Sequence, residues 1–343
     1  MKWTFFGPGR FAEAASVWDS INSAASDLAI LDSRTIACAI DHFSSGDELA
    51  CIGHDALGPA LGLVLRKQGM ARWESFQPSQ LPIGPTVTRP GLDIGQAVES
   101  LARALPGLCL SVGLTELDPL LTARPTPGQR LATSDFVETA WIDVDQAFED
   151  YWSQRGKNLR QNVRKQTTKL ESEGTPPKLI SIEAPDAMAA AIAVYGELES
   201  AGWKGREGTA VSAGNVQGRF YTALFETLAA SGQARVYQLW VGDKVVASDL
   251  CLERAGIHIV LKTAYDEAEK KFSPSTLLRF QAFESLFGTE AVRRVEFYGK
   301  RMEWHTRWTD NVRTLYHLTC YRGSAVRTIA DLARRLKNEP ANA

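Results

Sequence analysis

The chain contains 343 residues, a length that at roughly 150 residues per domain predicts two domains. Hydrophobic residues make up 44% and charged residues 23%, which excludes a disordered, a collagen-like and a coiled-coil chain. Apolar runs such as Ala189–Val194 are far shorter than the roughly 18 residues that span a bilayer, and Gly7-Pro8-Gly9 interrupts the N-terminus before a secretory leader forms. We therefore expect a soluble, cytoplasmic protein with no membrane insertion.

Charge is divided unevenly between the two halves of the chain. Residues 1–150 carry 10 Lys+Arg against 19 Asp+Glu, whereas residues 151–343 carry 28 against 21. We expect an anionic ligand to meet the second half, although domains also differ in charge by chance. The 5 cysteines include no C-x-x-C pair and the 5 histidines no H-E-x-x-H or H-x-H spacing, so we expect buried thiols and no metal site.

The first half is predicted to be mixed α/β. Helical periodicity marks Phe11–Ile21 and residues 98–105, and the apolar run Ile36–Ile40 is typical of a strand. Further strands are expected at 47–54, 59–67, 108–114 and 136–144. Turn-rich connections at 78–91 and 118–135 separate these elements.

The second half alternates helices and strands in a more regular order. Helices are expected at 155–173, 188–198, 216–228, 273–287 and 326–336, and strands at 235–241, 245–253, 257–265, 295–298 and 314–321. Ala255-Gly256 is predicted to be a two-residue turn, so the strands that flank it form an antiparallel hairpin. Ser273 and Pro274 suit the N-cap and the first position of the next helix.

Sequence motifs in the second half resemble a known family. They are WKGREGTA at 203–210, LKTAYDE at 261–267, SPSTLL at 273–278, EFYGKRMEWHTRWTD at 296–310 and RTLYHLTCYR at 313–322. With the order of elements from 234 to 321, they resemble the GNAT superfamily, in particular the group related to the cellulose-biosynthesis CelD proteins and, more distantly, the FemAB aminoacyltransferases. The resemblance implies two tandem GNAT-like α/β domains with mixed sheets flanked by helices: a degenerate domain at 1–145 and an acyltransferase domain at 146–343.

The resemblance also implies an activity. A GNAT-type N-acyltransferase moves an acyl group from acyl-CoA, such as acetyl-CoA, to an amine, here a small molecule or a glycan precursor in exopolysaccharide or cell-envelope synthesis. One alternative is a FemAB-like enzyme that uses aminoacyl-tRNA. Another is a polysaccharide-assembly protein without catalysis. The chain departs from the family in one respect, because the usual pyrophosphate signature, [Q/R]-x-x-G-x-[G/A], is absent from the expected position.

Asp249 and Lys262 form a candidate catalytic pair. Each is a charged residue in a strand with apolar neighbours. If Ala255-Gly256 is the hairpin turn, residue 254 pairs with 257, and counting back places Asp249 opposite Lys262 on one face. Such a pair either holds substrate or tunes a base, or it is a simple cross-strand ion pair. A register shift of one residue would separate the two side chains.

The end of the second hairpin strand and the start of the next helix carry further candidates. Tyr265 is suited to protonate a leaving thiolate, and Asp266 to act as base or to orient the amine, since α/β folds place ligand chemistry at strand ends. The cofactor pyrophosphate needs the free N–H groups of a helix N-terminus. This sequence offers such a site at Lys270, Ser273, Ser275 and Thr276. The alternative is a turn with a packed tyrosine and a well-capped helix.

Two aromatic and basic segments are candidates for substrate binding. In the glycine-spaced loop after residue 198, Trp203 suits contact with an adenine or sugar ring, and Lys204 and Arg206 suit contact with an anion. The alternative is a solvated loop with a buried Trp203. After the strand at 295–298, the candidates are Tyr298, Lys300 and Trp304, although aromatic residues at this density are usually core.

Overall fold

The computed structural model of the chain describes residues 1–202 and 210–338. Contacts divide the chain into two α/β units: unit 1 comprises Met1–Asp27, Leu31–Val137 and Thr314–Ala343, and unit 2 comprises Leu28–Ile30 and Glu138–Arg313. The segment from residue 314 onward was expected in the second domain but belongs to unit 1. The reason is strand pairing, because Leu318 and Cys320 in β13 (Val312–Tyr321) lie opposite residues of β6 (Ser111–Leu117).

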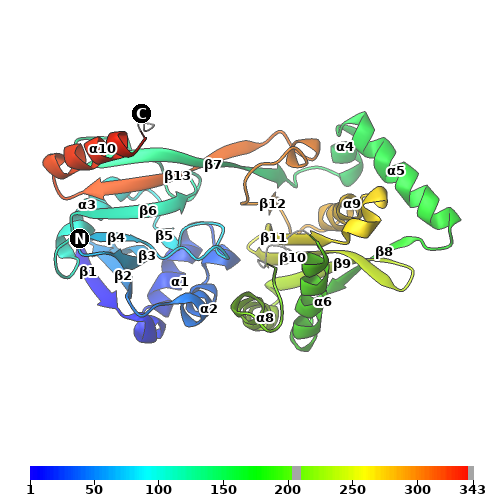
Figure 1. The fold of residues 1–343 in the computed structure, drawn as a ribbon, viewed down its shortest axis with the longest axis horizontal. Helices are drawn as coiled ribbons and strands as arrows, with labels where there is room; N and C mark the ends of the chain where they lie inside the picture. Colours follow the sequence, from blue (N-terminus) through cyan, green and yellow to red (C-terminus); the bar gives the residue numbers. More distant parts are fainter. Residues whose placement is uncertain (203–209, 339–343) are drawn as a thin grey trace, which may run out of the picture. The chain divides into compact units, whose positions relative to one another are not determined.

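Unit 1 has a mixed sheet with helices on both faces (Figure 1). Its strands follow the order β1-β2-β3-β4-β6-β13, in which only β4 and β6 are parallel neighbours, and β5 pairs with β3. The remaining strands are β1 (Lys2–Phe6), β2 (Glu48–Asp55), β3 (Gly58–Gln68), β4 (Arg72–Ser75) and β5 (Thr86–Thr88). The helices are α1 (Ala15–Ala24), α2 (Ser33–Phe43), α3 (Ile94–Ala104) and α10 (Ser324–Asn338).

The expected strand at Ile36–Ile40 is instead the middle of helix α2. The carboxylate of Asp32 caps this helix by accepting a hydrogen bond from the backbone N–H of Arg34. Ile36, Ala39 and Ile40 are buried, and their spacing of three and four residues places them on one helical face. A short apolar run fits both structures, and the cap decides between them.

Unit 2 has a second mixed sheet, in the order β7-β12-β11-β10-β9-β8, with β8 at the edge. The strands are β7 (Leu131–Asp143), β8 (Pro177–Ile182), β9 (Ala234–Val241), β10 (Lys244–Arg254), β11 (Ile257–Tyr265) and β12 (Arg294–Glu296). The helices are α4 (Phe148–Ser153), α5 (Lys157–Ser172), α6 (Met188–Ala201), α8 (Val216–Ala229) and α9 (Pro274–Phe287), with a 3-10 turn, η4 (Glu267–Phe272), between β11 and α9.

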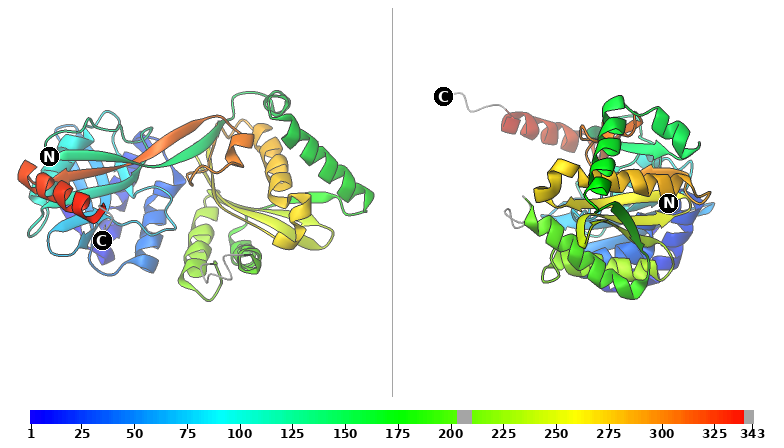
Figure 2. Two further views of the ribbon diagram at one scale, coloured as in Figure 1. Left: turned by 45° about the horizontal axis from the view of Figure 1, so that its top comes forward. Right: turned by 90° about the vertical axis from the view of Figure 1, so that its right-hand side faces the viewer.

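The two faces of the unit 2 sheet are covered by different helices (Figures 1 and 2). Helices α4, α5 and α9 lie on one face, over a core that includes Leu239, Cys251 and Phe283. Helices α6 and α8 lie on the opposite face and contact β9, β10 and β11. A side chain on β10 or β11 therefore meets α9 or α6 according to its position in the alternation of the strand.

Among residues 1–202 and 210–338, none of the helices combines the length and the apolar character that a transmembrane segment requires. All 5 cysteines are free thiols, and 4 of them are buried.

Candidate functional site

The β10–β11 hairpin turns at Ala255-Gly256 as predicted, and Arg254 pairs with Ile257. The register then shifts at a bulge, because Cys251 pairs with Val260 whereas Leu250 pairs with Lys262. Asp249 consequently lies opposite Thr263, and the expected Asp249–Lys262 pair is wrong. The extra residue sends the two charged side chains to opposite faces of the sheet.

Lys262 faces helix α6 and pairs with a buried carboxylate there. Its Nζ atom lies 3.4 Å from Oε1 of Glu199, whose side chain is only 3% exposed. The same oxygen accepts a hydrogen bond of 3.1 Å from the hydroxyl of Tyr195, and Oε2 accepts one of 2.7 Å from the backbone N–H of Val211. Lys262 also lies over the ring of Tyr221, 5.3 Å from its centroid. These contacts fix a carboxylate and an ammonium group between α6 and β11.

Asp249 faces helix α9 and belongs to a second buried cluster. Nη2 of Arg279 donates a hydrogen bond of 2.9 Å to Oγ1 of Thr263, and the Thr263 hydroxyl bonds to Asp249. Burial raises the pKa of Asp249 and lowers the pKa of Arg279, and each charge partly offsets the effect on the other. Arg279 also stacks on Trp304, 3.9 Å from the ring centroid.

A small opening lies where the Glu199 cluster reaches the surface of unit 2. Its cavity is about 50 Å³ and is lined by Leu198, Glu199, Gly202, Thr263, Ala264, Tyr265 and Glu267. Glu199, Glu267 and the half-exposed Tyr265 thus line one small site. The volume and the negative charge suit an ammonium group, which carboxylates hold by charge-assisted hydrogen bonds.

Asp266, expected as a base, has structural partners instead. Its carboxylate lies 2.5 Å from the ammonium group of Lys244 and accepts a hydrogen bond from the backbone N–H of Ala268, which caps η4. The hydrogen bond from Lys244 is the main cause of the lowered pKa of Asp266. A carboxylate with a lowered pKa is a weak base, so this geometry does not favour the expected role.

The start of α9, where we expected the cofactor phosphates to bind, differs from the prediction in its cap and in its backbone donors. Ser273 stands at the N-cap in the left-handed region, with φ 55°, and its side chain makes no capping hydrogen bond. Pro274 occupies the first turn as predicted but has no N–H, and the N–H of Thr276 donates to the carbonyl of Ser273. The exposed Lys270 precedes this turn. Fewer backbone donors are available at residues 274–276 than an anion cradle needs.

The predicted substrate-binding residues that the structure describes, Tyr298, Lys300 and Trp304, are not among those that line the opening. Tyr298 is buried in the left-handed region, with φ 46°, and packs under the guanidinium of Arg313. Trp304 stacks on His305 with ring centroids 3.5 Å apart, and Lys300 is exposed. Burial and the charge of Arg279 lower the pKa of His305 to about 4. Trp203, Lys204 and Arg206 fall outside the described residues.

Sequence reasoning missed Glu199, Tyr195 and Arg279. The sequence does indicate the first two, because Glu199 follows Tyr195 by four residues and lies on the same buried face of the apolar helix MAAAIAVYGELESA. Arg279 is likewise a charge on the buried face of α9. A buried charge requires a partner, so each of these positions indicates a polar site in the core.

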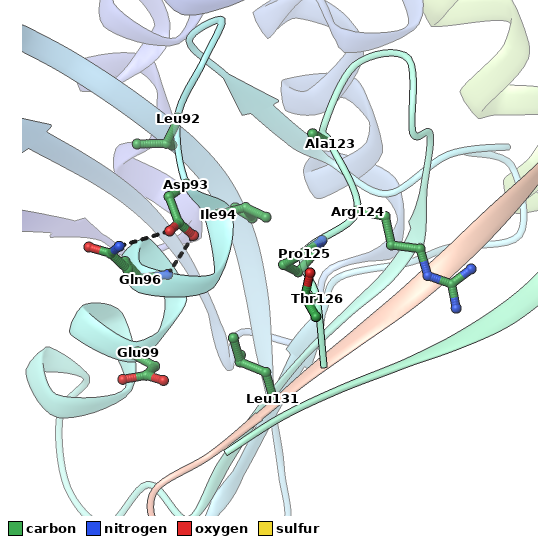
Figure 3. Close-up of a pocket in the computed structure, with 10 residues that line it drawn as sticks. All are labelled: Leu92, Asp93, Ile94, Gln96, Glu99, Ala123, Arg124, Pro125, Thr126 and Leu131. Atoms are coloured by element: carbon green, nitrogen blue, oxygen red, sulfur yellow. Dashed lines mark hydrogen bonds between the residues drawn. The ribbon is translucent and has the colours of Figure 1, made fainter. Parts of the chain in front are cut away.

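Unit 1 contains a larger cavity, of about 450 Å³, between the start of α3 and residues 123–131 (Figure 3). The carboxylate of Asp93 already occupies the N-terminus of α3, where it accepts hydrogen bonds from the backbone and side chain of Gln96. Arg124 is used in an ion pair with Asp135. Glu99, another carboxylate of the lining, pairs with Arg103, so the charged side chains of this cavity already have partners. Across the described part of the chain, no three His, Cys, Asp or Glu side chains group as metal ligands.

Comparison with known families identifies the unit 2 domain. Residues 157–306 match the family model described as an acetyltransferase (GNAT) domain. The matched segment contains the Glu199 cluster, the hairpin and helix α9, so this part of the chain is a GNAT-type N-acyltransferase domain. No curated protein matches the chain.

Solved structures share the fold over nearly the whole chain. A protein described as the C-terminal domain of a lysylphosphatidylglycerol synthetase from Agrobacterium fabrum has a TM-score of 0.57 at 13% identity, covering 95% of this chain and 96% of its own. FemX has a TM-score of 0.57 at 8% identity, covering 97% and 99%. L-PGS from Bacillus licheniformis has a TM-score of 0.52 at 13% identity, covering 94% and 97%. At these identities the similarity establishes the fold alone.

Proposed function

We propose that the protein transfers an acyl group from acyl-CoA to a primary amine that binds at the opening between α6 and β11. The observation that carries this proposal is the convergence of Glu199, Glu267 and Tyr265 on one small cavity within the GNAT domain. An amine arrives as an ammonium ion at neutral pH and has to lose a proton before it attacks. The two carboxylates supply charge for binding and a base for the proton.

The proposed reaction assigns one step to each group. A carboxylate of the opening accepts a proton from the ammonium group, and the amine nitrogen then forms a bond to the thioester carbonyl carbon. The tetrahedral intermediate expels the CoA sulfur, and the C–S bond breaks. Tyr265 donates its hydroxyl proton to the leaving thiolate, and the second proton that the attacking nitrogen loses returns to Tyr265 through solvent, so the products are an amide and a free thiol. Lys262 is proposed to act indirectly, by holding Glu199 charged and in place.

The donor is proposed to lie along η4 and the start of α9. Lys270 and Lys271 are exposed there, and Ser275 and Thr276 in the first turn are half-buried. These cations and hydroxyl groups support phosphate binding even though the turn offers few backbone donors. Residues 270–276 contain no glycine, so a phosphate site made of Lys270, Ser273, Ser275 and Thr276 would differ from the usual glycine-containing pyrophosphate signature of the family.

The donor assay tests this proposal. Release of free thiol from acetyl-CoA is measured with a panel of primary amines and with the corresponding alcohols as controls. We expect thiol release that depends on a primary amine and is stoichiometric with the acylated product by mass spectrometry. If no acyl-CoA of any chain length supports acylation of any amine, the acyl-CoA proposal is wrong.

A second candidate is aminoacyl transfer from aminoacyl-tRNA, as the FemAB resemblance implies. Two observations favour it: the shared fold with FemX and L-PGS, and the basic character of α5. Residues 153–170 contain 6 Lys and Arg and no acid, and the apolar face of α5 is buried, which leaves the cations outward. A basic helix face suits a phosphate backbone, and its binding would weaken steeply with salt. Transfer from a charged tRNA but not from acetyl-CoA would establish this second candidate.

The biological setting is a separate part of the proposal. A role in exopolysaccharide or cell-envelope synthesis and a grouping with CelD proteins rest on the sequence resemblance, and the proposed cytoplasmic location rests on the short apolar runs of the sequence. A glycan precursor that carries a free amine is therefore the first acceptor to include in the panel.

A further inference from the structure

A second cavity in unit 2 lies at the edge of the sheet, away from the opening between α6 and β11. It has a volume of about 520 Å³ and lies over β8 and the end of β9. Volumes of about 300–1,000 Å³ are usual for small-molecule sites. The GNAT reaction proposed above uses none of its residues.

The register of β8 and β9 determines which side chains line this cavity. Lys178 lies opposite Trp240, and Ile180 lies opposite Gln238. Because side chains alternate along a strand, these four and Ile182 share one face, whereas Leu179 packs on the other face against the α9 core. The cavity thus has an indole ring and two isoleucines as an apolar lining, beside polar groups.

The polar groups of the cavity are hydrogen-bond donors. The indole N–H of Trp240 donates a hydrogen bond of 3.3 Å to Oε1 of Gln238, and the side chain of Gln238 is buried. This contact uses the carbonyl oxygen of the amide and leaves its NH₂ group for the cavity. Among the described residues that line the cavity, Lys178 is the only charged one. Two hydrogen-bond donors, the cationic Lys178 and the amide of Gln238, therefore lie beside an apolar surface.

We propose that this cavity binds an aromatic carboxylate. The flat body of such a ligand matches the exposed part of the Trp240 ring and the side chains of Ile180 and Ile182. Its carboxylate oxygens match the ammonium group of Lys178 and the amide NH₂ of Gln238, which are about two residues apart along the sheet, or roughly 7 Å. A cationic or uncharged analogue of the same shape leaves Lys178 without a counter-charge.

Isothermal titration of the full chain with 2-naphthoate tests this site. We expect one site per chain, and at least tenfold weaker binding of 2-naphthamide and of 2-naphthylmethylamine. Lys178→Met and Trp240→Leu should each weaken 2-naphthoate at least tenfold. Lys165→Met removes an exposed lysine of α5 and should leave binding unchanged, so it is the matched control.

Three results would overturn the proposal: no binding of 2-naphthoate at millimolar concentration, equal affinity for the amide, or unchanged affinity in Lys178→Met. Lys178 is exposed on an edge strand, so its variant keeps the test valid if Trp240→Leu fails to fold. The inference does not depend on the acyltransferase proposal, since the titration contains neither donor nor amine.

Discussion

The ammonium group of Lys262 lies 3.4 Å from Oε1 of Glu199, so a strand residue and a helix residue form an ion pair between β11 and α6. The pair exists because the bulge in the hairpin turns Lys262 toward α6 and Asp249 toward α9. The hairpin therefore supplies one charged residue to each of two separate clusters.

Two double-mutant cycles test this arrangement. Lys262→Met leaves the Glu199 carboxylate without its cation, and we expect a loss of unfolding free energy toward the lower end of about 3–5 kcal/mol, because Lys262 is partly exposed. Combined with Glu199→Gln, the losses should be strongly non-additive. The matched cycle pairs Lys262→Met with Asp249→Asn and should be nearly additive. A larger coupling energy in the Asp249 cycle than in the Glu199 cycle would contradict the observed register.

Gly202 tests the geometry of the opening without removing a functional group. A Cβ atom at this position would lie 2.9 Å from Oε1 of Glu267, the far end of a flexible side chain. Gly202→Ala should therefore fold normally but displace Glu267, raising KM for the amine several-fold with a smaller effect on kcat. Gly288→Ala is the control, since its nearest neighbour is 3.4 Å away and it lies at the C-cap of α9. Equal kinetics in the two variants would show that Glu267 does not contact the amine.

Glu116 in unit 1 predicts a pH dependence of stability. Its backbone has φ 54°, Oε2 accepts a hydrogen bond from Gln77, and burial raises its pKa from 4.5 to about 7. Because the folded-state pKa is the higher one, the stabilising contribution is complete below about pH 4.5 and is lost as pH rises to about 7.

Glu116→Gln removes this titration. We expect equal stability of variant and wild type near pH 4.5, and a more stable variant at pH 8, by on the order of 1 kcal/mol after allowance for solvent screening. Urea unfolding at the two pH values measures the difference. Glu226→Gln, an exposed change on α8, should show no such pH-dependent gain. A Glu116→Gln variant whose stability parallels the wild type from pH 4.5 to 8 would refute the assignment.

Tyr265 is expected to act in the chemical step. Tyr265→Phe should lower kcat by about 10²–10⁴-fold while donor affinity barely changes, because one proton-transfer group is lost and the ring remains. The side chain is 39% exposed, so the change should not affect folding. Full turnover in the variant would mean that another group or water protonates the thiolate.

Much of the fold follows from periodic patterns, and the exceptions have local causes. The hairpin turn at Ala255-Gly256 was predictable because two-residue turns have a sequence signature, whereas the bulge beside Leu250 has none. That single extra residue was enough to separate Asp249 from Lys262. For Ile36–Ile40, a five-residue apolar run leaves the structure open, and the Asp32 cap on helix α2 decides it.

The candidate site was predictable in part. Tyr265 was placed correctly at a strand end that lines a cavity. Glu199 comes to the same cavity from α6, over sixty residues earlier in the chain, and only the packing of α6 on β11 brings the two together. Pairings between elements that distant depend on tertiary contacts, which strand and helix patterns do not encode.

The central claim is that the opening between α6 and β11 binds the amine, and a matched pair of glutamates tests it most directly. Glu267 lines the opening, whereas Glu269 in the same turn pairs with Lys271 outside it. The measurement is kcat/KM for the best amine acceptor at saturating acyl donor. We predict that Glu267→Gln lowers it at least tenfold through KM and that Glu269→Gln matches the wild type. Wild-type kinetics in Glu267→Gln, or an equal loss in both variants, would contradict the assignment of the site.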